Sequence, residues 1–472
     1  MDINPSASIL TSLYPGAAVV DARSRIVLPG FVNAHFHGES VLLRAITRRS
    51  PYAAWKSLTG LREAEGRLLD PSSAQDVATL YRIAGYLHTR SGTTTVAEYP
   101  SPYAPRVLEA AAENFALAGL RSVFALRTWE QTEFFRNAPA GSPRHALSLG
   151  AEDDYTVYSL ESLVRASAGT QFPLVAHLGE TRADVDALRT RFKKSPLRIL
   201  KDAGALTPAT HLIHCNHVPD RDLDIIREIG SPVTLCVRST VAKQTGYPLL
   251  RALASRDVMA CLGTDWGETD LLGEIRVLRN LRKYVPGVPS FTPLELIRMA
   301  TINGAHALGV SSHTGSLEVG KHADLVMIPS DDIRFPPLGA HPTAEQTAEI
   351  VTDYCDTGMI SDVMVEGTFR VRDSADQRTD GAEVLRDFRI LQDVFLPPPA
   401  RAQEGIGAAG VPFLQPPAGE KAPLLGHDES GEGAPRESGA NIRPPGPPAD
   451  DTLQKFPVIT KKIGKIFGEN DI

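Results

Sequence analysis

The sequence of 472 residues is poor in several features that would place it in other classes of protein. Four cysteines occur, without a CxxC pair, which indicates buried, reduced thiols in a cytoplasmic protein rather than disulfides or metal ligands. No apolar run reaches about 18 residues, and the first residues lack a secretory leader, so no membrane contact is expected. The net charge of −7 argues against a nucleic-acid-binding surface.

What the sequence does contain is a regular alternation of short apolar runs and helix-length segments. The apolar runs form eight strand candidates, at 25–32, 93–97, 121–126, a strand ending at 149, 172–176, 211–213, 233–236 and 258–262. Strands that alternate with helices pair in parallel, and eight such units over about 240 residues predict a closed (β/α)₈ barrel of the TIM type. A doubly wound sheet usually carries a glycine-rich nucleotide turn after its first strand, and this chain has His-Phe-His-Gly there instead.

The remaining segments suggest a smaller unit and a tail. Glycines spaced around apolar residues at 314–328 and 362–367 predict a small antiparallel β unit. We therefore expect residues 1–28 to form the N-terminal part of a small β domain, 29–310 the barrel, and 311–396 the rest of the small domain with a final helix. Helices are also expected over 248–256 and 293–308. The segment 397–472 is rich in Pro and Gly, and its composition predicts a disordered tail.

Histidines follow the first strand candidate in a pattern suited to metal binding. His35 and His37 are separated by one residue, so on a strand both imidazoles point to the same face. Polar side chains also end three later strands, at the C-terminal face where barrel enzymes have their active sites: His177 with Glu180, His214, and Asp265. Three imidazoles and one carboxylate form a ligand set for zinc or a similar divalent metal.

With these motifs in view, the chain resembles the amidohydrolase superfamily, in the branch of cytosine deaminases, guanine deaminases and triazine hydrolases. The resemblance lies in PGFVNAHFHG, LVAHLGET, LIHCNHV, CLGTDWG, and ATINGAHALG followed by TGSLEVGKHADLVMI, which span 29 to about 370. It implies a (β/α)₈ barrel beside a small β-sandwich built from both chain ends. It also implies one zinc ion, with Fe²⁺ as the alternative metal, on His35, His37, His177 and Asp265. By the same resemblance, Glu180 is the proton shuttle, and His214 polarises the water or the substrate.

The expected reaction is hydrolysis of a carbon–nitrogen bond, with Glu180, His214 and Asp265 as catalytic residues. A bound metal lowers the pKa of its water to about 7, Asp265 takes the proton, and Glu180 protonates the leaving nitrogen. Dinuclear relatives bridge two metals through a carbamylated lysine or a carboxylate. No lysine lies between Lys56 and Lys193, so a lysine bridge on the third or fourth strand is excluded.

The substrate is the least determined part. Two turns that face the substrate in deaminases of this branch are altered here, and they carry Glu152 and Arg238. Arg238 suits a carboxylate, whereas a neighbouring loop offers it an ordinary salt bridge. With Trp266, these two residues are the candidate substrate-binding residues. They favour an unusual small molecule or natural product over a common nucleobase.

Several alternatives stay open. One is deamination of a nucleobase or a triazine-type heterocycle, as opposed to cleavage of an amide or amidine. Another is a metal-binding scaffold without catalytic activity. The expected partner is a small-molecule substrate, without nucleic acid or membrane. Relatives of this kind are often homodimers, which leaves a homodimer open for this chain.

Overall fold

The computed structural model describes residues 7–48, 50–100, 104–126, 145–150, 174–246, 258–284, 291–337 and 342–396. The chain divides into two compact units, 1–405 and 406–472, and all described residues lie in the first. Glu152, the helix expected over 248–256 and the tail expected over 397–472 lie outside the described residues. Among the described helices, none has the length and apolar character needed to cross a membrane.

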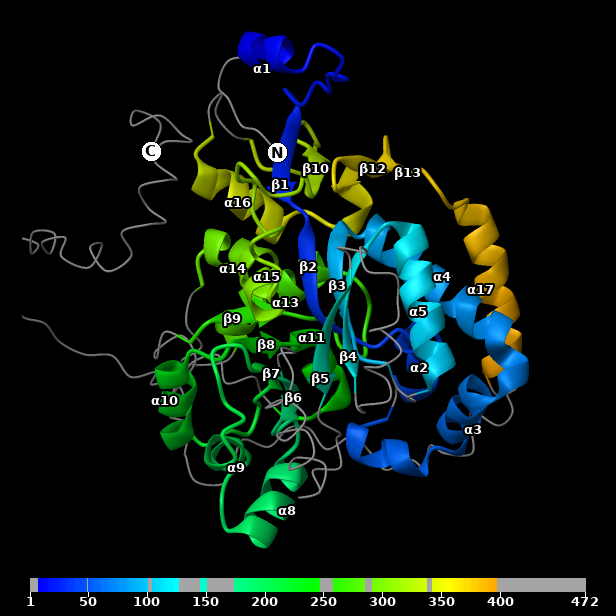
Figure 1. The fold of residues 1–472 in the computed structure, drawn as a ribbon, viewed down its shortest axis with the longest axis vertical. Helices are drawn as coiled ribbons and strands as arrows, with labels where there is room; N and C mark the ends of the chain where they lie inside the picture. The colour runs from blue at the N-terminus through cyan, green and yellow to red at the C-terminus, as the bar shows by residue number, and fades with distance from the viewer. Residues whose placement is uncertain are drawn as a thin grey trace, which may run out of the picture. The chain divides into compact units, whose positions relative to one another are not determined.

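An eight-stranded parallel sheet forms the centre of the first unit (Figure 1). Its strands follow one another in chain order: β2 (Phe31–Phe36), β3 (Thr93–Glu98), β4 (Arg121–Leu126), β5 (His145–Gly150), β6 (Leu174–Leu178), β7 (His211–His214), β8 (Val233–Leu235) and β9 (Ala260–Leu262). All neighbouring pairs are parallel. The number and the direction of the expected strands are therefore confirmed.

The first and last of these strands also meet. Phe36 and Asp265 form an isolated parallel bridge. The carbonyl of His35 accepts hydrogen bonds from the backbone N–H groups of Thr264 and Asp265, both at 2.9 Å. These bonds bring the residues that follow β9 against the end of β2.

Helices connect the strands and cover the sheet (Figure 1). Figure 1 shows α4 and α5 beside β3 and β4, with α17 alongside α4, and α8 to α10 near β6 and β7. The α-helices are α1 (Ala7–Leu13), α2 (Ser40–Thr47), α3 (Thr59–Leu69), α4 (Ala74–Arg90), α5 (Pro105–Ala118), α8 (Arg182–Phe192), α9 (Pro196–Asp202), α10 (Asp220–Ile229), α11 (Val237–Lys243), α13 (Leu271–Tyr284), α14 (Pro293–Met299), α15 (Ile302–Ala307), α16 (Ala344–Asp353) and α17 (Gly381–Phe395). Short 3₁₀ helices are η1 (Tyr52–Ser57), η2 (Pro71–Ser73) and η3 (Thr357–Met359).

A second sheet is antiparallel and contains residues from both ends of the described chain. Its order is β1 (Arg25–Pro29), β10 (Leu325–Pro329), β11 (Asp362–Val365), β12 (Thr368–Arg372) and β13 (Ala375–Asp376). Val27 pairs with Met327, and Val326 pairs with Val363. The antiparallel unit expected around 314–328 and 362–367 is therefore present, with β1 as its N-terminal strand.

The apolar run at 25–32 forms two strands rather than one. It divides at Gly30, where β1 joins the antiparallel sheet and β2 enters the parallel sheet. Gly30 lies so close to Thr94 that any Cβ would overlap the threonine side chain. The chain can change sheets here because glycine alone fits this close approach.

The prediction of a single helix over 293–308 is also wrong, since two helices, α14 and α15, occupy this segment. The chain breaks at Thr301, whose φ of −133° and ψ of −99° are not helical. The carbonyl of Ala300 instead accepts a hydrogen bond of 2.8 Å from the N–H of Val32. The break thus satisfies a backbone group of β2 and lays α15 against that strand.

A buried ion-pair network links the two sheets. Arg121, the first residue of β4, contacts Asp324 at 2.5 Å and Glu366 at 3.0 Å, and its side chain is 2% exposed. The hydroxyl of Thr314 and the N–H of Glu366 donate to the Asp324 carboxylate. The buried charge of Asp324 is therefore matched by one cation and two dipolar donors.

Candidate metal centre and its surroundings

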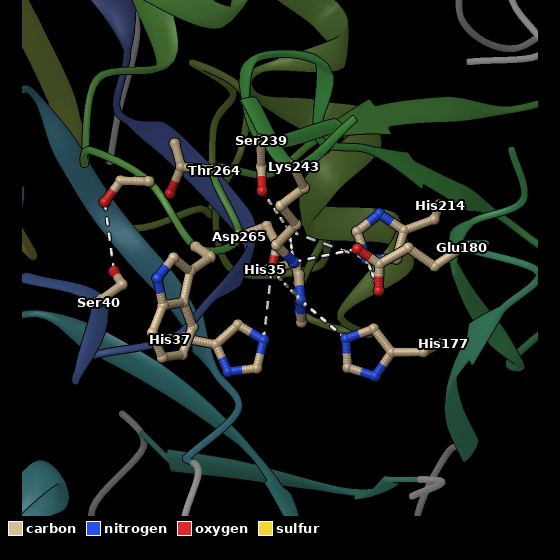
Figure 2. A network of polar contacts seen from close by, with 12 residues as sticks. His35, His37, Ser40, His177, Glu180, His214, Ser239, Lys243, Thr264 and Asp265 are labelled. Atoms are coloured by element: carbon tan, nitrogen blue, oxygen red, sulfur yellow. Dashed lines mark hydrogen bonds and ion pairs between the residues drawn. The ribbon is translucent and has the colours of Figure 1, made fainter. Parts of the chain in front are cut away.

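Four side chains from three strand ends converge on one buried point (Figure 2). His35 lies in β2 and His37 directly follows it, His177 lies in β6, and Asp265 follows β9. None of these four side chains is more than 9% exposed. The structure therefore brings together the four residues for which the sequence predicted metal binding.

The ligand atoms of this cluster face one another closely. His35 Nε2 lies 3.1 Å from His177 Nε2 and 3.4 Å from Asp265 Oδ1. His37 Nε2 lies 3.3 Å from the same carboxylate oxygen. Two triplets have all their ligand atoms within 4.8 Å of one another, namely His35, His37 and His177, and His35, His214 and Asp265. This spacing allows the side chains to share one metal ion.

Two of the converging residues have strained backbone. The φ angles are 70° at His214 and 53° at Asp265, in the left-handed region that non-glycine residues seldom adopt. Such conformations persist where the surrounding structure enforces them, and they concentrate at functional sites. At both positions the chain turns sharply as the strand ends, which directs the side chain to the cluster.

The Asp265 segment also depends on Gly263. A Cβ at Gly263 would lie 2.8 Å from the backbone nitrogen and from the Cβ of His35. Glycine therefore permits the close approach of the chain after β9 to β2, and this approach places Asp265 beside His35 and His37.

Burial and neighbouring charges shift the pKa values of the clustered histidines in different directions. Burial holds the pKa of His35 and of His214 well below the usual value, so both imidazoles are neutral and offer lone pairs. Burial also lowers the pKa of His37, but Asp265 and Glu39 outweigh this effect and raise it to about 10. Burial raises the pKa of Asp265, yet Lys243 and the neighbouring histidines bring it well below its usual value, so this carboxylate is ionised.

Glu180 and His214 lie beside this cluster, on the side opposite His37 (Figure 2). Glu180 Oε2 is 3.7 Å from His214 Nε2, and His214 Nε2 is 3.9 Å from Asp265 Oδ2. A capping box between Thr181 and Asp184 begins α8 immediately after Glu180 and so fixes where this glutamate leaves the sheet. Glu180 and His214 are thus close enough to exchange protons with a substrate held at the cluster.

Sequence reasoning missed Lys243 and Ser239, both on α11. Lys243 Nζ lies 2.6 Å from Asp265 Oδ2 and 3.1 Å from Glu180 Oε1, and Ser239 donates to Asp265 Oδ2 at 2.6 Å. Burial lowers the pKa of Lys243, but the two carboxylates raise it above its usual value, so the ammonium stays charged. The signal in the sequence was a lysine five residues after Arg238, in the segment that follows the seventh parallel strand.

Aromatic rings surround the histidines. The ring of Tyr99 lies 4.5 Å from that of His177, and Trp266 lies 5.8 Å from His37 and 5.1 Å from Trp55, between ring centroids. The Trp266 Nε1–H donates to Thr47 and so anchors the indole. Trp266 therefore lies beside the histidines, and its contact with a substrate stays a prediction.

Two carboxylates lie behind His37. His37 Nδ1 is 3.4 Å from Glu39 Oε1, and Glu98 accepts hydrogen bonds from the N–H of Gly38 and the hydroxyl of Tyr81. Burial raises the pKa of Glu98, and the nearby charge of Glu39 adds to this effect. A carboxylate on the outer nitrogen of an imidazole orients the ring and makes the inner nitrogen a better metal ligand.

Arg238 points to neighbouring carboxylates. Its guanidinium lies 2.9 Å from Glu268 and 3.7 Å from Asp270, and its backbone N–H donates to the Glu274 carboxylate. The ordinary salt bridge weighed for Arg238 is therefore present. Its binding of a substrate stays a prediction, as does that of Glu152, which lies outside the described residues.

Comparison with known proteins agrees with this arrangement. A model of the amidohydrolase family matches residues 26–370. A 5-methylthioadenosine/S-adenosylhomocysteine deaminase of Moorella thermoacetica is 30% identical over 334 residues, which cover 68% of this chain and 76% of that protein. A 5'-deoxyadenosine deaminase of Methanosarcina acetivorans is 28% identical over 342 residues, which cover 68% of this chain and 76% of that protein.

Solved structures share the fold. A zinc-bound adenosine deaminase from Xanthomonas campestris superposes with a TM-score of 0.68 at 22% identity, over 79% of this chain and 86% of that one. An atrazine chlorohydrolase from Arthrobacter aurescens, complexed with zinc, gives 0.70 at 21% identity, over 80% and 91%. The chain therefore belongs to the amidohydrolase family and is a hydrolase that acts on carbon–nitrogen bonds.

Proposed function

We propose that this protein is a zinc-dependent aminohydrolase that removes the amino group from the purine ring of an adenosine-type nucleoside. The observation that carries the proposal is the convergence of three imidazoles and one carboxylate, His35, His37, His177 and Asp265, on one buried point. Nitrogen and carboxylate ligands at this spacing suit a single Zn²⁺, and Fe²⁺ is the alternative.

The residues present fit a divalent cation in a second respect. Asp265 Oδ1 is a buried polar atom that receives no hydrogen bond from the part of the chain that the structure describes. A buried acceptor without a donor is costly, and a cation would satisfy it. Binding would also replace the proton on His37, as metal ions do when they take a basic ligand.

We further propose that the eight-stranded sheet is a closed barrel spanning 29–310, with the small β domain formed by 1–28 and 311–396. The bridge between Phe36 and Asp265 and the hydrogen bonds to the His35 carbonyl support closure. Closure favours the proposed site because it places the first and last strand ends next to each other at one face.

The chemistry divides among the side chains. A bound divalent metal would polarise a water molecule and bring its pKa to about 7. Asp265 is placed to accept the proton that the water loses, since its carboxylate is ionised and lies at the cluster. Glu180 is placed to give a proton to the leaving nitrogen, and His214 lies between these two carboxylates, where it orients the attacking oxygen.

The substrate class is inferred from the relatives and from the rings. The curated relatives are named as deaminases of 5-methylthioadenosine, S-adenosylhomocysteine and 5'-deoxyadenosine, which share an adenine ring on a sugar. Tyr99 and Trp266 supply flat apolar surfaces beside the histidines, and Trp55 lies against Trp266, as a planar heterocycle requires. The expectation of an acidic or natural-product substrate depends on the charge of Arg238, and this charge is already paired with Glu268.

A screen of zinc-loaded enzyme for ammonia release and product mass tests this proposal. The panel contains adenosine and 5'-modified adenosines, free adenine, guanine and cytosine, triazines, and N-acyl peptides. We expect turnover of the adenosine group, and loss of that turnover in Glu180→Gln. Turnover restricted to amides or triazines would contradict the adenosine-type substrate. Metal binding without any turnover would favour a metal-binding scaffold without catalytic activity.

A further inference from the structure

A buried ammonium group stands between the two carboxylates of the proposed site. Lys243, the last residue of α11, is 6% exposed, and its Nζ contacts both Asp265 and Glu180 (Figure 2). A lysine seldom becomes buried unless it is paired, because removing its charge from water is costly. Its burial here therefore calls for a role that the two carboxylates share.

The contacts of Asp265 are divided between its two oxygens. Oδ2 accepts from Lys243 Nζ and from the Ser239 hydroxyl, both at 2.6 Å. Oδ1 faces His35 and His37, at 3.4 and 3.3 Å from their Nε2 atoms. Donors on one oxygen fix the rotation of the carboxylate, so the other oxygen is presented to the histidines.

The contacts of Glu180 are likewise divided between its two carboxylate oxygens. Its Oε1 accepts from Lys243 Nζ at 3.1 Å, and its Oε2 lies 3.7 Å from His214 Nε2. One ammonium thus holds one oxygen of each carboxylate. Without this cation, two buried carboxylates would repel each other, and one of them would turn away or take up a proton.

Lys243 is itself held from the outside. Its Nζ lies 5.1 Å from the ring centroid of Tyr52 and 5.5 Å from that of Trp55, both on η1. Aromatic faces at this distance attract an ammonium group. The lysine is therefore fixed between the aromatic residues of η1 on one side and the two carboxylates on the other.

We propose that Lys243 is a positioning residue that sets the rotation of both Asp265 and Glu180, so that Asp265 offers Oδ1 to the metal and Glu180 offers Oε2 to the substrate side. This inference rests on the proposed function for the role of the metal. Lys243 itself neither binds the metal nor contacts the reacting atoms. It acts through the two carboxylates.

Lys243→Met tests the inference, because methionine keeps an unbranched side chain and removes the charge. A misplacement of catalytic groups by about 1 Å costs roughly 100-fold in rate, so we expect kcat to fall by about 100-fold with KM little changed. Lys243→Arg keeps a cation and is expected to recover part of the loss. The matched control is Lys321→Met, a lysine 12% exposed and paired with Glu318, which should leave kcat unchanged.

The visible absorption spectrum of the Co²⁺-loaded protein provides a readout that is independent of activity. We expect Lys243→Met to bind one Co²⁺ per chain, because all four ligands remain, but with altered ligand-field bands, because Asp265 is no longer held. The spectra of Lys243→Arg and of Lys321→Met should remain close to the wild-type spectrum.

The outcomes separate the two proposals. An unchanged Co²⁺ spectrum in folded Lys243→Met, with unchanged kcat, would overturn the positioning role. If Lys243→Met does not fold, Lys243→Gln takes its place, since it also removes the charge and should shift the spectrum in the same direction; an unshifted spectrum there would overturn the role. Failure of the wild type to turn over any nucleoside would count against the proposed function and leave the spectral comparison intact.

Discussion

The buried ion pair between Arg121 and Asp324 yields a stability prediction that can be worked out from the structure. Arg121→Met removes a cation that is 2% exposed from a carboxylate that is 1% exposed. Breaking a buried pair on one side costs about 3–5 kcal/mol, because a buried charge is left without its partner. Asp324 keeps two donors, the Thr314 hydroxyl and the Glu366 N–H, so we expect a loss of about 3 kcal/mol in the free energy of unfolding.

Urea unfolding followed by far-UV circular dichroism measures this loss as a shift of the midpoint at constant m. Arg182→Met is the matched control, since Arg182 forms an exposed pair with Asp186 and should cost about 0.3–0.5 kcal/mol. Arg121→Met combined with Asp324→Asn should be more stable than Arg121→Met alone, because the buried charge of Asp324 is removed as well. Equal losses in Arg121→Met and Arg182→Met would refute the reasoning.

Two other predictions concern backbone fit and pH. Gly263→Ala should reduce the amount of metal bound per chain, because the added Cβ pushes against His35; elemental analysis measures this, and wild-type metal content in the variant would contradict it. Burial raises the pKa of Glu274 from 4.5 to about 8, so across this interval the folded protein keeps a proton that the unfolded chain has lost, and stability falls as pH rises. Glu274→Gln should flatten that decline in urea unfolding at the two ends of the interval, and an unchanged slope would argue against it.

The sequence predicted the strands, and the histidines that lie together, because both depend on local pattern. His35 and His37 could be assigned to one face because alternate residues on a strand share a side. The eight parallel strands followed from apolar runs alternating with helices, and the composite antiparallel sheet followed from glycines spaced among apolar residues.

What the sequence could not give depends on contacts between distant segments. Lys243 meets Glu180 across 63 positions, and no local pattern reports such a contact. The sequence could not decide whether Arg238 binds a substrate or forms a salt bridge, because its partner, Glu268, lies in the distant segment before α13. The sequence predicted one continuous helix over 293–308. The break depends on a hydrogen bond between the Ala300 carbonyl and Val32, which is far away in the chain, so no local pattern indicates it.

The most direct test of the central claim is the metal dependence of deamination by the full chain. The protein is stripped with a chelator, and Zn²⁺ is added back in measured steps while ammonia release from an adenosine-type nucleoside is followed. The account predicts no activity without metal and a linear rise that ends at one equivalent per chain, with no rise in His35→Ala/His37→Ala. Full turnover by the metal-free protein, or restoration of the double variant by one equivalent of Zn²⁺, would contradict it.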